Sequence, residues 1–398
     1  MYRLLVVITV FIALSPASGH SQAVQPPAPS TPQVLPLEQA VVNAANDLFS
    51  KAALPGDASQ RIVLVVDPLI DGNTGMQTIE SGWIGNRIAA LVNSKYPRFD
   101  LRTFTSATVR QKPVVLIGTF TPINQAGQAQ ALRDAYRVCL GLADLNSGKL
   151  VSKGFALAQP SGVDPTPIGF FRDSPVWTPD AATDAYIRSC QGTKSGDPIK
   201  PIYVERIQTA ALLSDAIRQY DAGSYNKALD LYKEAATTPG GDQLRVYNGI
   251  YLANLKLNRM REAEAAYAKL VEYGLKNERL AIKFLYQTGK TTFLRNRQIV
   301  APYPMWIKQI ASEATRGDQC LEVVGHTSHT GTQEFNDALS LRRAESMRAR
   351  LVAQTTSLQQ KLSAKGLGWR ENLIGTGRDD LSDAIDRRVE LKVVRCVT

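Results

Sequence analysis

The stretch that decides the fold is CLEVVGHTSHTGTQEFNDALSLRRAESMRARL, residues 320–351. It opens with a short apolar run that reaches Gly325, which predicts a buried strand ending in a turn. Leu339 and Ala344 belong to a second pattern, with the spacing of a helix. We therefore expect a strand, a tight turn and a helix in close succession.

The expected helix has polar residues on a face that should point inward. Asn336, Ser340 and Arg343 are spaced i, i+4 and i+7, so they lie within about 60° of one another around the helix axis. Met347 and Leu351 continue the same stripe. Because polar groups on a buried face need partners, these three side chains must meet either loop backbone or a ligand.

Three further motifs accompany the helix. They are the turn Gly325-His326-Thr327-Ser328, the glycine pair in Leu373-Ile374-Gly375-Thr376-Gly377, and the strand Asp386-Arg387-Arg388-Val389-Glu390-Leu391. The set resembles the OmpA-like peptidoglycan-binding domain, whose pattern is Gly-His-Thr-Asp, Asn-x-x-Leu-Ser-x-x-Arg-Ala, Gly-x-Gly and Asn/Asp-Arg-Arg-Val-Glu. For residues 291–398 the resemblance implies an α+β fold, a mixed sheet with helices.

The same resemblance implies non-covalent binding of the peptide stem of peptidoglycan. It assigns the contact to Thr327, Ser328, Asn336, Ser340, Arg343 and Arg388. The Arg343 guanidinium is expected to hold a stem carboxylate, usually that of diaminopimelate, through a bidentate fork. A network of the protein's own polar groups is the alternative for these side chains.

The turn departs from the family pattern at its fourth residue. Ser328 stands where the family has the Asp that meets the diaminopimelate ammonium, so an acceptor remains but the charge is lost. If wall binding survives, the resemblance implies that Ser328→Asp tightens it. His326 and His329 have no Cys or third His nearby in the sequence, so we expect no metal site there.

Residues 204–290 show helical patterns with recurrent small and aromatic residues. A first copy contains Gly223, Tyr225, Ala228, Tyr232 and Ala235, and a second contains Tyr247, Ala263 and Tyr267. The spacing resembles the tetratricopeptide repeat, in which small residues let paired helices approach and aromatic rings fill the space between hairpins. An unrelated pair of helical hairpins is the alternative. We expect a further helix near 277–286 and a surface for another envelope protein.

Residues 38–203 predict an α/β domain. Helices are expected at 38–54 and 78–95, strands at 61–66 and 114–117, and a hairpin joining 138–142 to 151–157. The order, with its Leu-Asn-Ser-Gly-Lys-Leu turn, resembles the small α/β domains of bacterial envelope assembly proteins related to the curli secretion lipoprotein. Asp67, Asp71 and Asp144 lie near strand ends and suit either a metal or acid/base site or ordinary turns.

The amino-terminal residues predict export. An apolar run from Leu4 to Leu14 follows one positive charge and ends in small residues, which is typical of a signal peptide, here 1–23. The run is short for a membrane span, although an uncleaved anchor is the alternative. The proline-rich residues 24–37 predict an extended linker. Because no Cys precedes Cys139, we expect no lipid anchor. Because the short apolar run is removed with the signal peptide, we expect no membrane span in the mature chain.

Composition and cysteine content narrow the function further. The 46 Lys and Arg exceed the 36 Asp and Glu, but the excess is spread along the chain and predicts no nucleic-acid surface. We find no nucleophile beside a base and no phosphate loop, so we expect no enzyme and no cofactor. Exported proteins keep disulfides, and we pair Cys139 with Cys190 and Cys320 with Cys396, one of three connectivities, with buried thiols as the alternative.

Taken together, these features predict a multi-domain periplasmic protein associated with the cell wall and outer membrane. It is expected to bind peptidoglycan and to anchor or scaffold partners there. The alternative is an assembly or secretion adaptor that acts through the repeats, with weak or no wall binding.

Overall fold

The computed structural model describes residues 33–54, 60–124, 128, 133–176, 179–280, 282–375, 377–379 and 382–396. The predicted signal peptide and nearly all of the predicted linker lie outside these ranges. Within them, no helix is both long enough and apolar enough to cross a membrane.

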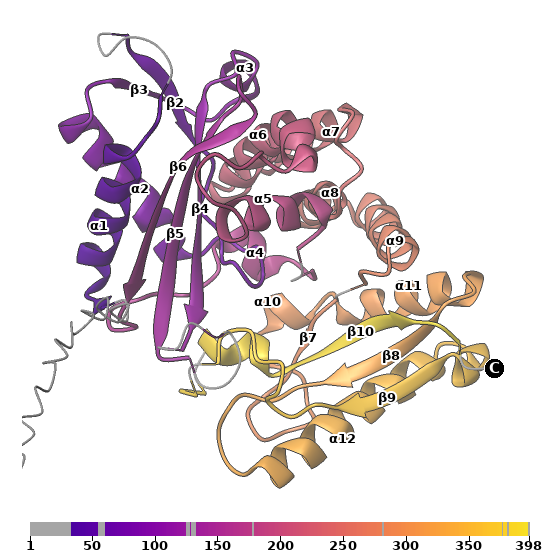
Figure 1. Ribbon diagram of the computed structural model, residues 1–398. Coiled ribbons are helices and arrows are strands. Elements are labelled where there is room, and N and C mark those ends of the chain that lie inside the picture. Colours follow the sequence, from indigo (N-terminus) through magenta and orange to yellow (C-terminus); the bar gives the residue numbers. More distant parts are fainter. Residues whose placement is uncertain are drawn as a thin grey trace, which may run out of the picture. The chain divides into compact units, whose positions relative to one another are not determined.

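Six strands form the first sheet, in the order β1-β6-β5-β4-β2-β3 (Figure 1). β2 is parallel to β3 and β4, whereas β4, β5 and β6 form an antiparallel meander. The strands are β1 Val34–Leu35, β2 Ile62–Val66, β3 Phe99–Arg102, β4 Val114–Ile123, β5 Ala135–Asp144 and β6 Lys149–Ala158. The strands and the hairpin expected here are therefore present, and β4 and β5 are longer than their apolar patterns indicated.

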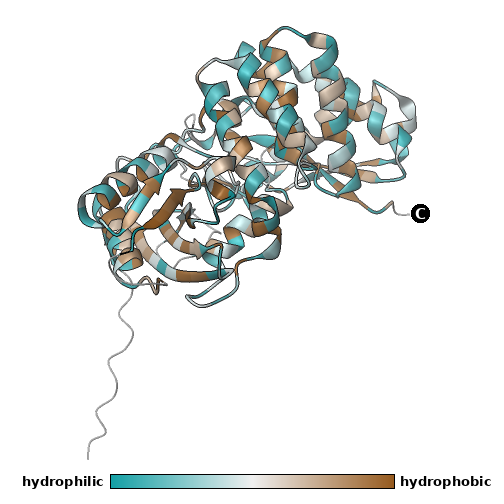
Figure 2. Ribbon diagram, turned by 90° about the horizontal axis from the view of Figure 1, so that it is seen from above, coloured by the Kyte–Doolittle hydropathy of each residue, from teal (hydrophilic) through white to brown (hydrophobic). Residues whose placement is uncertain are grey.

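Helices cover both faces of this sheet, which explains why its strands are apolar on both sides (Figure 2). Along β4, Leu116 packs against α1 and α2, whereas Val115 and Ile117 pack against α3, α5 and α6. Gly154 allows α1 to lie close, because a Cβ there would be 2.0 Å from the Ala44 carbonyl oxygen. The helices are α1 Leu37–Ser50, α2 Ile79–Lys95, α3 Ser106–Val109, α4 Gly169–Asp173, α5 Ala181–Gln191 and α6 Pro201–Asp221.

Antiparallel helical hairpins follow the first sheet. They consist of α6 with α7 Tyr225–Thr237, α8 Leu244–Lys256 and α9 Met260–Lys276. The recurrent residues do pack closely: Tyr232 and Tyr267 are fully buried, and a Cβ at Gly249 would lie 2.3 Å from the Tyr232 ring. The helix expected near 277–286 was a wrong prediction, because α9 ends at Lys276 and Phe284–Leu285 instead forms β7, which pairs with β10.

A second, four-stranded sheet has the order β7-β10-β8-β9 and carries helices on one face (Figure 1). β10 is antiparallel to β7 and β8, and β9 is parallel to β8. The elements are β7, α10 Arg297–Val300, α11 Tyr303–Arg316, β8 Cys320–Gly325, α12 Gln333–Val352, β9 Leu362–Gly366, β10 Arg388–Val394 and the 3₁₀ turns η1 Thr356–Gln360 and η2 Ser382–Asp386. The strand, turn and helix deduced from residues 320–351 are thus β8, its turn and α12.

Two glycines let α12 lie directly on this sheet. A Cβ at Gly325 would be 1.9 Å from the Ser340 carbonyl oxygen, and one at Gly366 would be 2.5 Å from the Leu341 nitrogen. Gly368 also lies close to α12, because a Cβ there would be 2.6 Å from Asp337 Oδ1. Gly375 lies instead next to the Arg133 side chain.

The two cysteine pairs differ. Cys320 and Cys396 form a disulfide that ties the start of β8 to the chain just past β10. The second predicted bond is absent from this structure: Cys139 and Cys190 are free thiols with their Sγ atoms 2.8 Å apart. Each thiol instead donates to the other residue's backbone carbonyl, across 2.9 and 3.0 Å.

Candidate functional site

Five of the six residues singled out by the sequence gather around the turn that follows β8. Thr327 and Ser328 lie in this turn, while α12 brings Asn336, Ser340 and Arg343 beneath it. All five are buried. The inward orientation deduced from the i, i+4, i+7 spacing is confirmed.

The Arg343 guanidinium is engaged by loop backbone. Nε donates to the Lys290 carbonyl, Nη1 to that of His326 and Nη2 to that of Gln287, at 2.8 to 2.9 Å. The side chain is 0% exposed and lies 5.3 Å from the Tyr286 ring centroid. Burial lowers the pKa of Arg343 to about 10, against the opposing effect of Tyr286. In this structure Arg343 therefore ties the loop 287–290 to the turn after β8 and is covered.

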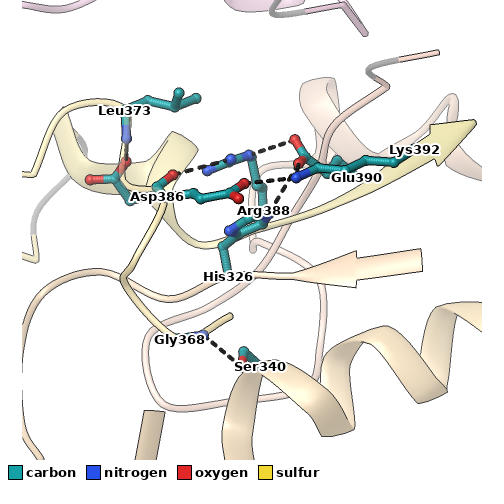
Figure 3. A network of polar contacts seen from close by, with 9 residues as sticks. His326, Ser340, Gly368, Leu373, Asp386, Arg388, Glu390 and Lys392 are labelled. Atoms are coloured by element: carbon teal, nitrogen blue, oxygen red, sulfur yellow. Dashed lines mark hydrogen bonds and ion pairs between the residues drawn. The ribbon is translucent and has the colours of Figure 1, made fainter. Parts of the chain in front are cut away.

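Asn336 and Ser340 also have protein partners. The Asn336 amide donates to the carbonyls of Thr330 and Thr332 at 2.7 and 2.8 Å. The Ser340 hydroxyl donates to the Asp337 carbonyl and accepts the Gly368 N–H at 2.9 Å, as Figure 3 shows for the latter. These side chains shape the turn and the β9 end, which matches the structural alternative for the helix face.

The turn itself meets a residue that sequence reasoning missed. The Ser328 hydroxyl donates to the Asp379 carboxylate at 2.5 Å, and the Thr330 hydroxyl does so at 3.2 Å. Arg387 forms an ion pair with the same carboxylate at 2.7 Å. Thr327, by contrast, has a buried hydroxyl with no partner among the described residues. The acidic run after Gly377 was the available signal, but nothing in it pointed to the turn.

Arg388 belongs to a buried charge network on the other face of β10 (Figure 3). Its Nε lies 3.1 Å from a Glu390 carboxylate oxygen, and both side chains are almost fully buried. Lys392 lies 3.5 Å from Glu390, and His326 Nε2 lies 3.2 Å from it. Burial alone would raise the pKa of Glu390, but Arg388, the bond from His326 and Lys392 hold it below its ordinary value. Arg388 thus already has an acidic partner inside the protein.

The loop that carries Asp379 is fixed at its base by Asp386. Its carboxylate accepts the backbone N–H groups of Leu373, Ile374 and Gly375 at 2.6, 3.1 and 2.7 Å. Figure 3 shows the bond from Leu373. Burial raises the pKa of Asp386, while these N–H groups act in the opposite direction. The acid that opens the Asp-Arg-Arg-Val-Glu motif therefore shapes the loop above the turn.

One group of side chains has the ligand types of a metal site. His326, Glu371 and Glu390 place one ligand atom each within 4.8 Å of one another. Lys392 already pairs with both Glu371 and Glu390, at 2.8 and 3.5 Å, and Arg388 shares Glu390. Two cations therefore occupy the carboxylates that a metal ion would need, and the arrangement is better described as an ion-pair network.

The three acids of the first sheet do not converge on one site. Asp71 and Asp144 accept backbone N–H groups of the turns that follow them, which is the ordinary role of a turn aspartate. Asp67 instead accepts the Tyr203 hydroxyl at 2.8 Å beside a cavity of about 50 Å³. Burial raises the pKa of Asp67 to about 7, against the opposing effects of Tyr203 and Arg245.

Comparison with known proteins finds a family match in the carboxy-terminal part of the chain. The sequence model described as "OmpA family" matches residues 286–384. The peptidoglycan-associated lipoprotein of Pseudomonas aeruginosa is 40% identical over 83 residues, which are 21% of this chain and 48% of that protein. This chain thus spans about half the length of the curated relative it matches.

Solved structures of low similarity were also found. The crystal structure of the peptidoglycan-associated lipoprotein from Burkholderia pseudomallei has 23% identity and a TM-score of 0.25, covering 28% of this chain and 89% of that one. The cell wall anchor of the T6SS from Pseudomonas aeruginosa has 22% identity and a TM-score of 0.23, covering 29% and 80%. On the family match, the carboxy-terminal part of the chain is an OmpA-like domain.

Proposed function

We propose that this protein binds peptidoglycan non-covalently through its OmpA-like domain and so anchors or scaffolds partners at the cell wall. The observation that carries the proposal is the polar turn 325–331, which lies inside the OmpA-matched range. Its Ser328 hydroxyl donates to the partly exposed Asp379 carboxylate, and Arg343 lies buried next to the turn. The name of the 40% identical relative supports the same ligand. The predicted export signal agrees with a periplasmic location beside the wall and outer membrane.

The test is sedimentation of the mature chain with purified peptidoglycan sacculi. We expect the wild type to co-sediment, Arg343→Ala to bind about ten- to a hundredfold more weakly, and exposed Arg342→Ala to bind almost as well as wild type. Arg343→Ala also removes three hydrogen bonds to loop carbonyls, so its thermal unfolding is measured in parallel. A wild-type chain that stays in the supernatant contradicts the proposal.

A second candidate function is a protein adaptor that acts through the helical hairpins. A groove of about 550 Å³ is lined by residues of α7, α8 and α9 and of the turn before α9. It contains Lys233, Arg259 and Lys269 against one acid, Glu262, which suits an acidic peptide. Under this hypothesis Lys233→Glu/Lys269→Glu abolishes capture of an envelope partner and leaves sedimentation with sacculi unchanged. Loss of sedimentation in the same variant would contradict separate roles for the two parts.

A further inference from the structure

A carboxylate from a distant loop faces the turn where Ser328 carries no charge. Asp379 is 51 residues away from Ser328 in the chain, yet its Oδ1 lies 2.5 Å from the Ser328 hydroxyl. Thr330 and Arg387 hold the same carboxylate from two other directions. The turn is therefore supplied with an acid, although its own sequence lacks one.

The Asp379 carboxylate is held in place but remains accessible. Its backbone adopts φ 59° and its N–H donates to the Asp383 carboxylate at 3.1 Å, which fixes the backbone at this position. Two hydrogen bonds described here end on Oδ1 and one on Oδ2, out of about four acceptor positions that a carboxylate offers. The side chain is 18% exposed, whereas that of Arg387 is 4% exposed.

We propose that Asp379 accepts the free ammonium group of the peptidoglycan stem peptide, in the role that Ser328 cannot fill. This assignment rests on the proposed wall binding and adds the residue that recognises the ligand's charge. Arg343 and Arg387 are buried, whereas the Asp379 side chain is 18% exposed beside the exposed Arg378, so an ammonium group can reach the carboxylate from solvent. A charge-assisted bond from an ammonium is about twice as strong as one from a neutral donor, so the site favours a stem peptide with a free amine.

The contact between the Ser328 hydroxyl and the Asp379 carboxylate also explains why an uncharged residue suits position 328. An aspartate at position 328 would bring a second carboxylate against Asp379, where like charges oppose joint ionisation. Ser328→Asp alone should therefore weaken ligand binding, contrary to the expectation from the family pattern. Moving the acid, in Ser328→Asp/Asp379→Ser, restores one carboxylate and one hydroxyl at the same place.

The experiment measures binding of the mature full chain to sacculi and to a soluble stem peptide that carries a free side-chain amine. The same peptide with that amine acetylated is the second ligand. For wild type we expect acetylation to weaken binding about tenfold or more, and for Asp379→Asn we expect weak binding that acetylation barely changes. Ser328→Asp should also lose affinity, and the double variant should return to within about threefold of wild type.

Asp337→Asn is the matched control, because Asp337 is also paired with an arginine, Arg370, but on the exposed side of α12. It should bind like wild type. Thermal unfolding of each variant identifies loss of fold, and recovery in the double variant supports the assignment even where Asp379→Asn is destabilised. Wild-type binding that ignores acetylation, or that survives Asp379→Asn, overturns the role of Asp379 and leaves wall binding intact. Failure of wild type to bind either sacculi or peptide overturns both proposals.

Discussion

The two sheets of this protein bury their carboxyl groups in opposite ways. Beside the first sheet, Asp67 is buried against Tyr203, and burial raises its pKa to about 7. In the second sheet, Glu390 is equally buried, but Arg388, His326 and Lys392 hold its pKa below the ordinary value. Where burial outweighs the neighbouring groups, an acid keeps its proton, whereas a close cationic partner such as Arg388 favours the charged form.

From this comparison we expect the two groups of buried side chains to contribute to the stability of the fold in opposite pH ranges. Asp67 has a raised pKa, so its contribution to stability is complete below about pH 4 and is lost as the pH rises through about 7. Burial lowers the pKa of His326 to about 4, and Glu390 is lowered too, so their contributions are complete above about pH 6.5 and are lost as the pH falls. Acid should loosen the second sheet before the first.

The largest effect is expected for Glu390→Gln. The substitution keeps the shape but removes the carboxylate of the buried Glu390–Arg388 ion pair, which should cost about 3–5 kcal/mol of unfolding free energy. Urea denaturation at pH 7 measures it. Glu371→Gln is the control, because Glu371 pairs with Lys392 at the surface and should matter far less. Equal losses in the two variants would show that burial is not what makes the network important.

The two sheets also differ in their cysteines, because only Cys320 and Cys396 are joined by a covalent bond in this structure. Cys320→Ser/Cys396→Ser should lose about 2–4 kcal/mol, because the bond closes a loop with a sequence separation of 76. Cys139→Ala/Cys190→Ala removes two free thiols and no covalent link, so the loss should be smaller. A reductant should bring wild type down to the level of the serine variant while leaving that variant unchanged. If reduction destabilises the serine variant as much as wild type, the Cys320–Cys396 bond is not the source of the stability.

The smallest change in unfolding free energy is expected for substitution of Asp67. Asp67→Asn avoids ionising a buried acid, so at pH 8 it should be more stable than wild type by about 1–2 kcal/mol, with the difference shrinking towards pH 5. Tyr203→Phe removes the bond that lowers the pKa of Asp67 and should extend the loss of stability to higher pH. Unfolding free energies from pH 5 to 8 measure both. If the unfolding free energy of Asp67→Asn varied with pH in parallel with that of wild type, Asp67 would not be titrating in this range.

The sequence pattern predicted β8 and α12 well, because the burial pattern of a strand or a helix repeats with a fixed period along the chain. β8 and α12 match the pattern of residues 320–351, and the i, i+4, i+7 spacing correctly placed Arg343 on the inner face. The partners of Arg343 were not predictable, because the carbonyls of Gln287 and Lys290 come from a segment more than fifty residues away in the chain. Periodicity says which side of a helix is buried, but not what covers it.

By itself, the sequence determined strand β8, helix α12 with its inward face, the OmpA-like motifs and the absence of an acid at position 328. Only the tertiary structure decided that Gly366 and Gly368 contact α12, that Arg388 pairs with Glu390, and that Asp379 returns a carboxylate to Ser328. The physical reason is range: local patterns fix backbone conformation and the buried side, whereas the charge of a site is the sum of groups that folding collects from distant segments.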